Sequence, residues 1–66
     1  MKLSRLKTGD VVECDVRGRR FHAVFTTLEI REGVGPVAAV QPISHNVSYQ
    51  QVTARQVVAI FRRLKS

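Results

Sequence analysis

The chain has 66 residues, and its eleven Lys and Arg against five Asp and Glu give a formal net charge of +6 at pH 7. A chain of this length builds one small core, so residues 1–66 are expected to form a single domain, and 44% hydrophobic residues argue against disorder throughout. No apolar run suits a signal peptide or the roughly 20 residues that span a bilayer, and a lone cysteine excludes an internal disulfide; we therefore expect a cytoplasmic protein without a membrane partner.

The first predicted element is a β-strand over residues 11–16. Thr8-Gly9-Asp10 is typical of a turn, and the residues after it alternate, with Val12, Cys14 and Val16 on one face. Residues 17–19 then predict a tight turn, because the glycine at position 18 can take a positive φ. We expect Cys14 to be a buried, reduced thiol.

The second predicted strand is long and starts near Phe21. Its apolar positions change phase at Thr26 and Thr27, which predicts a β-bulge or a sharp bend. Residues 32–36 are expected to form a loop, followed by a third strand over 37–40 or slightly beyond, with Pro42 at its end or at an edge. A turn at 44–46 leads to a fourth predicted strand over 47–52, which includes Tyr49.

The last segment fits two interpretations. A short turn over 53–56 and a strand over 57–62 are favoured, because Val57, Val58, Ile60 and Phe61 are residues that prefer strands. A helix over 53–64 is the alternative, because the same residues also form a helical stripe and residues 53–56 are similar to a capping box.

Leu6-Lys7-Thr8-Gly9-Asp10-Val11-Val12 before a first strand, three further strands and a single turn before a final strand resemble the small SH3-like barrels, which include KOW and Tudor-type domains. The resemblance implies a mainly β fold, a five-stranded barrel with a single-turn helix before the last strand. Because such barrels contact RNA, DNA, peptides and other subunits, the resemblance leaves the function open. The expected core consists of Val12, Cys14, Val16, Phe21, Ala23, Phe25, Leu28, Val40, Val52, Val58 and Phe61.

The positive charge is clustered, and these clusters are the candidate binding residues. Three arginines on a tight turn can reach phosphates or enter a narrow minor groove, so the hairpin tip is the primary candidate. The two ends of the chain are expected to meet in a second patch, to which Arg55 of the 53–56 turn adds one donor if it faces the same side. The predicted contacts are Arg17, Arg19 and Arg20 at the tip, and Lys2, Arg5, Lys7, Arg55, Arg62, Arg63 and Lys65 around it.

Nothing in the sequence favours catalysis, a metal or a cofactor. His22 and His45 lie on different elements, and Cys14 is expected to face inward while His22 faces outward. The carboxylates, Asp10 among them, are interpreted as solvated strand and turn charges. We therefore expect a protein that is not an enzyme.

The function that these observations favour is a non-catalytic nucleic-acid-binding protein, bacterial or phage-encoded, that contacts duplex DNA or structured RNA through phosphates. The alternative is a protein-interaction module, or a small inhibitor or adaptor subunit, that docks on an acidic partner. A homodimer that pairs through an open strand is compatible with both.

Overall fold

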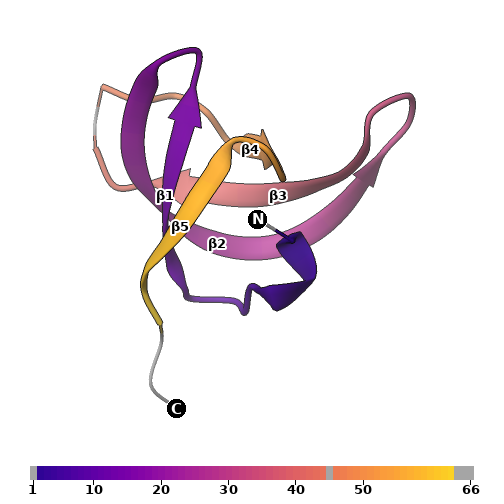
Figure 1. Ribbon diagram of the computed structural model, residues 1–66, viewed down its shortest axis with the longest axis horizontal. Coiled ribbons are helices and arrows are strands. Elements are labelled where there is room, and N and C mark those ends of the chain that lie inside the picture. The colour runs from indigo at the N-terminus through magenta and orange to yellow at the C-terminus, as the bar shows by residue number, and fades with distance from the viewer. Residues whose placement is uncertain (1, 45, 64–66) are drawn as a thin grey trace.

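A computed structural model describes residues 2–44 and 46–63. Five strands form one antiparallel sheet in the order β4-β3-β2-β1-β5, and a short 3₁₀ turn precedes them (Figure 1). The elements are η1 (Leu3–Arg5), β1 (Val11–Val16), β2 (Arg19–Arg31), β3 (Gly35–Pro42), β4 (Gln51–Thr53) and β5 (Val57–Arg62). The mainly β fold with five strands is confirmed, and so are the bounds predicted for the first and last strands.

Two parts of the predicted architecture differ from the structure. The sheet is not closed into a barrel, because β4 and β5 are its two edges in the described part of the chain. The segment between them is a hydrogen-bonded turn and not a single-turn helix: the Gln56 N–H donates to the Thr53 carbonyl (3.0 Å), and the Thr53 N–H donates to Gln56 Oε1 (2.9 Å). The alternative helix over 53–64 is wrong as far as residue 63, and position 64 lies outside the described residues.

The predicted bend in β2 is confirmed at Thr26. The register between β2 and β3 shifts between Phe25 and Thr27, so Thr26 has no partner of its own on β3. Its hydroxyl donates to the Ala39 carbonyl (2.9 Å), and its carbonyl accepts from the Thr8 hydroxyl (2.7 Å). These bonds satisfy polar groups that a bulge removes from the ladder.

The fourth strand is shorter than predicted. Residues 47–50 are irregular and β4 spans only Gln51–Thr53, although the Gln50 carbonyl still accepts from the Val40 N–H (2.9 Å). Tyr49 stacks on Phe21, with ring centroids 5.6 Å apart, and Val47 packs against the core. This segment is therefore held by side-chain packing instead of a strand ladder.

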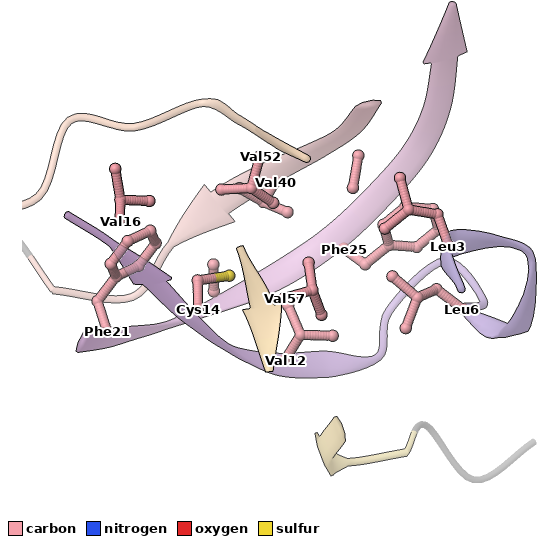
Figure 2. Packing of buried hydrophobic residues seen from close by; sticks show 12 residues of the cluster. Leu3, Leu6, Val12, Cys14, Val16, Phe21, Phe25, Val40, Val52 and Val57 are labelled. Carbon is pink, nitrogen blue, oxygen red and sulfur yellow. The ribbon is translucent and has the colours of Figure 1, made fainter. Parts of the chain in front are cut away.

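The core lies on the concave side of the sheet and contains most of the predicted residues. Val12, Cys14, Val16, Phe21, Ala23, Phe25, Val40 and Val52 are buried as expected. Leu3 and Leu6 close one end of the cluster against Phe25, while Val16 and Phe21 close the other (Figure 2). The 3₁₀ turn thus positions the N-terminal segment by burying two leucines.

Three predicted core residues, Leu28, Val58 and Phe61, are exposed. On β5 the reason is a pair of register shifts: Val57 pairs with Cys14, Ala59 with Glu13, Ile60 with Val12 and Arg62 with Val11. Val58 and Phe61 therefore have no partner on β1, and each extra residue reverses the inward and outward alternation. Val57 occupies the core position instead.

The turn before β1 is built around Asp10, which is 1% exposed, so its interpretation as a solvated charge is wrong. Its Oδ2 accepts from the Lys7 N–H (3.0 Å), and its own N–H donates to the Lys7 carbonyl (2.9 Å). Gly9 has a φ of 98°, which L side chains rarely adopt. The carboxylate thus stabilises the turn that leads into β1.

Candidate functional site

The hairpin tip between β1 and β2 is a two-residue turn. Val16 pairs with Arg19, and the two residues between them have positive φ, 55° at Arg17 and 85° at Gly18. This is the pattern of a type I′ turn, whose twist matches that of the flanking strands. The Gly18 N–H donates to Asp15 Oδ1 (3.0 Å), so the carboxylate fixes the turn from its base.

The three arginines at the tip are in different environments. Arg17 is exposed at the turn itself. Arg19 donates from a guanidinium nitrogen to the Asn46 carbonyl (2.9 Å), which ties the tip to the segment after β3. Arg20 lies 3.6 Å from Asp15 Oδ2, but its side chain is 69% exposed, so solvent screens this pair.

Arg19 and Arg20 also line a hollow of about 290 Å³ between the tip and the segment after β3. Phe21, His22, Ile43, Ser44, Asn46 and Val47 form the rest of its described wall. Two of the three predicted tip arginines, Arg19 and Arg20, thus share this hollow, and Arg17 is not among its lining residues.

The second basic area is a hollow of about 490 Å³ between the N-terminal turn and β5, here called the terminal hollow. Lys2, Arg5 and Arg63 line it together with Val58 and Ile60, and its described lining contains no carboxylate. The structure thus brings residues of the two chain ends together, as predicted. Lys65 lies outside the described residues, while Lys7 is exposed in the turn before β1 and is not among the lining residues.

The hairpin tip and the N-terminal turn, to which the two basic areas belong, lie toward opposite ends of β1 (Figure 1). At one end Val16 pairs with Arg19, and at the other Val11 pairs with Arg62. Five strand steps separate Val11 from Val16, which is roughly 17 Å at about 3.3 Å per residue. Arg55 belongs to the tip end and not to the terminal patch, because the neighbouring Gln56 carbonyl accepts from the Asp15 N–H (2.7 Å).

The side of β5-β1-β2 away from the core, here called the outer face, carries a contact that the sequence did not indicate. Phe61 is 62% exposed, and its ring centroid lies 4.4 Å from that of His22, with 49° between the planes. His22 pairs with Glu13 on this face, opposite in direction to the buried pair of Cys14 and Phe21. Only the bulges in β5, which have no signature in the sequence, bring Phe61 there.

A larger hollow of about 750 Å³ lies over β2, β3 and β4 and was also missed. Within it Gln51 Nε2 donates to Glu29 Oε2 (2.7 Å), and an Arg31 guanidinium nitrogen donates to Gln51 Oε1 (3.2 Å). Residues from β2 and β4, two strands that are far apart in the sequence, make this network, so no local motif could have predicted it. Its two charged side chains, Glu29 and Arg31, have opposite signs and are joined through Gln51, which distinguishes this hollow from the terminal hollow.

The groups that nucleophilic chemistry would need are separated. Cys14 is buried in the core, and burial, with a smaller contribution from the charge of Glu13, raises the pKa of its thiol to about 11. His22 faces the other side of the sheet, as predicted. No group of three or more His, Cys, Asp or Glu side chains that could hold a metal occurs within residues 2–44 and 46–63, and His45 lies outside them.

Comparison of the chain with protein-family models, with curated proteins and with solved structures finds no match. In the described structure no helix is long and apolar enough to cross a membrane.

Proposed function

We propose that this chain is a non-catalytic nucleic-acid-binding protein that contacts phosphates through the terminal hollow and the hairpin tip. The observation that carries the proposal is the terminal hollow, where Lys2, Arg5 and Arg63 surround one space without a carboxylate in its described lining. Like charges held together destabilise a small domain through mutual repulsion unless an anion binds between them. A phosphate group supplies that charge and accepts several hydrogen bonds.

The distance between the two basic areas favours a polyanion over a small anion. A single phosphate reaches one area, whereas a nucleic-acid strand extends across both. One strand of B-DNA carries a phosphate about every 3.4 Å along the axis, so the roughly 17 Å along β1 corresponds to about five phosphates. Arg17, Arg19 and Arg20 would contact one end of this stretch, and Lys2, Arg5 and Arg63 the other. Lys7, Arg55 and Arg62 would widen the footprint, as would Lys65.

The experiment is fluorescence anisotropy of labelled duplex DNA and of a labelled RNA stem–loop across a salt series. Each phosphate neutralised on B-DNA contributes about 0.9 to the slope of log K against log salt. Replacing Lys2, Arg5 and Arg63 together with Gln should flatten this slope by about two to three, and so should replacing Arg17, Arg19 and Arg20.

Arg31→Gln is the matched control, because it removes one positive charge at the Gln51 network, away from both basic areas. Its slope should stay close to that of the wild-type protein. If both triple variants keep the wild-type slope, neither basic area contacts phosphate and the proposal fails.

A second candidate is a protein-interaction module that docks on an acidic partner. The observation in favour of a protein partner is the far end of the β2–β3 hairpin, where Leu28, Ile30 and Val34 are exposed, Ile30 to 77%. The acidic character of that partner rests on the net charge of +6. Purification without nuclease distinguishes the two candidates: a nucleic-acid binder retains nucleic acid, seen in the ratio of nucleic-acid to protein absorbance, whereas an adaptor elutes clean at moderate salt. A homodimer, an acidic partner and a cytoplasmic location remain predictions.

The proposed fold relationship is with the small SH3-like barrels. Its support is the order β4-β3-β2-β1-β5, the bend in the long β2 and the tight turn between β4 and β5. A bent strand lets one sheet curl over its own core, which is the step that precedes closure into a barrel.

A further inference from the structure

We infer that the exposed ring of Phe61 is a stacking site for an unpaired base, so that the preferred ligand is nucleic acid with single-stranded nucleotides, such as the loop of a structured RNA. This inference rests on the proposed function and narrows its substrate class. It starts from the outer face, where a large aromatic side chain is 62% exposed and touches the ring of His22 at 4.4 Å between centroids.

The backbone of β5 presents this ring. Phe61 sits at a register shift between the pairs Val12–Ile60 and Val11–Arg62, so it has no cross-strand partner on β1. The contact with His22 supports the ring from one side and orients it, while most of its surface stays in solvent. A base that stacks on the open side of the Phe61 ring would leave that ring covered on both sides, by His22 and by the base.

Positive charge flanks the ring along the same face. Arg20 lies two residues before His22 on β2, which is roughly 7 Å along the strand, and alternation places both on the outer face. Arg62, the partner of Val11, is on the other side of Phe61. A ring between cations is the arrangement with which single-strand binders hold a base and its neighbouring phosphates.

The outer face also carries two carboxylates, Asp15 and Glu13. Asp15 accepts from the Gly18 N–H at 3.0 Å and lies 3.6 Å from the Arg20 Nε. Glu13 is half-buried between its partners His22 and Ala59, in the middle of the sheet. Glu13 therefore lies toward the centre, under the position of a stacked base, whereas Asp15 lies at the tip end opposite Arg20, where a phosphate would compete with it for an exposed guanidinium. At the other end, Arg62 pairs with an apolar residue, Val11.

A peptide strand is a poorer occupant of this surface. An added β-strand would have to pair with the free edge of β5, and the two register shifts in that strand disrupt the regular ladder that such pairing needs. An apolar side chain docked on Phe61 would also leave the arginines without anions. A nucleotide matches both the flat apolar ring and the flanking charge.

The chain contains no tryptophan, so Phe61→Trp creates a single fluorescent reporter at the proposed site. The probes are a labelled RNA stem–loop and a blunt duplex of the same stem. We expect the indole emission to be quenched by the stem–loop and not by the duplex. Ile30→Trp, on the β2–β3 hairpin, is the control that should respond to neither.

Affinity measurements complete the test. Phe61→Ala should weaken stem–loop binding by roughly five- to 150-fold, the range that corresponds to loss of one base stack, without changing the salt slope or the affinity for the duplex. Phe61→Trp should retain wild-type affinity.

Equal effects of Phe61→Ala on the stem–loop and the duplex, or no effect on either, would overturn the stacking site and leave the phosphate contacts standing. Failure of the wild-type protein to bind any probe at low salt would overturn both proposals. Circular dichroism of each variant establishes that it is folded, and the exposure of Phe61 means that its loss costs little packing.

Discussion

Arg17 occupies a backbone conformation that suits other residues better, and replacing it separates the stability of the tip from its charge. Its φ of 55° lies in the left-handed region, which costs an L-residue other than Gly, Asn or Asp about 1–2 kcal/mol. Asn is the residue that type I′ turns favour at this position, followed by the Gly that position 18 already supplies. Arg17→Asn should therefore stabilise the protein while it removes one cation.

The expected gain is about 0.5–1 kcal/mol, since Asn relieves part of the strain and keeps a side chain that limits the unfolded state. For a domain of this size 1 kcal/mol corresponds to about 4–8 °C, so the Tm should rise by about 2–8 °C. Arg17→Gly should lie between the wild type and Arg17→Asn, because glycine also adds about 0.4–1 kcal/mol of conformational entropy to the unfolded chain.

Thermal unfolding by circular dichroism measures the stability, and salt-dependent anisotropy measures the binding. Arg17→Lys is the matched control, because it keeps both the charge and the strained β-carbon and should match the wild type in Tm and in salt slope. On duplex DNA Arg17→Asn should flatten the slope by about 0.9 if Arg17 neutralises one phosphate. A Tm for Arg17→Asn no higher than that of Arg17→Lys would refute the assignment of strain to this residue.

Three further predictions concern the scaffold. Asp10→Ala should destabilise the protein by about 1–3 kcal/mol in urea unfolding, because the Lys7 N–H loses its carboxylate partner, whereas Asp10→Asn keeps an acceptor oxygen and should lose less. The free energy of unfolding should fall by roughly 2–3 kcal/mol between pH 8 and pH 12, because the Cys14 thiol has a pKa near 9 in the unfolded chain and a raised pKa of about 11 in the folded protein. Cys14→Ala should lack this part of the pH dependence, and an equal pH profile in the variant would contradict the prediction. Val57→Ala should cost about 2 kcal/mol and Val58→Ala less than 0.5 kcal/mol, and a reversed order would contradict the register of β5.

The alternating strands were predictable because their period is visible within a few residues. Residues 11–16 form a strand with the expected inward face, and the phase change at Thr26 correctly indicated a bulge. In both cases the positions of the apolar residues in the sequence show which side chains face the core and where that alternation changes. The burial of Val12, Cys14 and Val16 follows from the same alternation.

The last strand was predictable in extent and not in phase. Val57, Val58, Ile60 and Phe61 are all apolar, so no polar residue among them marks which positions face outward. Two bulges then place Val57 inside and Phe61 outside, and these bulges arise from pairing with β1, which is distant in the sequence. The same cause hid the contact between Phe61 and His22, which is the feature of the outer face that carries a testable function.

The candidate site was predictable where the place of a charged residue in the sequence is enough to infer its place in the fold. The ends of the chain were expected to meet because the resemblance to small barrels implies that the first and last strands pair, and the terminal hollow joins Lys2 and Arg5 to Arg63. The side that Arg55 faces was left open by the sequence, because its position depends on how β5 pairs along β1. The turn that contains Arg55 leads into β5 beside the hairpin tip, and the composition of the chain gives no information about which elements are neighbours.

Asp15 shows how the tip keeps its charge available while the turn stays ordered. Its hydrogen bond from the Gly18 N–H contributes about 0.5–1.5 kcal/mol to the turn, whereas its ion pair with the exposed Arg20 contributes about 0–1 kcal/mol and weakens with salt. The carboxylate therefore acts mainly on the backbone, and an incoming phosphate can compete for Arg20 without unfolding the hairpin. A type I′ turn with arginine at its strained position is consistent with the same priority, because Asn would make a more stable turn and would carry no charge. The backbone strain at Arg17 lowers the stability of a domain that has only a small core. This loss is the expected cost of placing a binding residue at the tip.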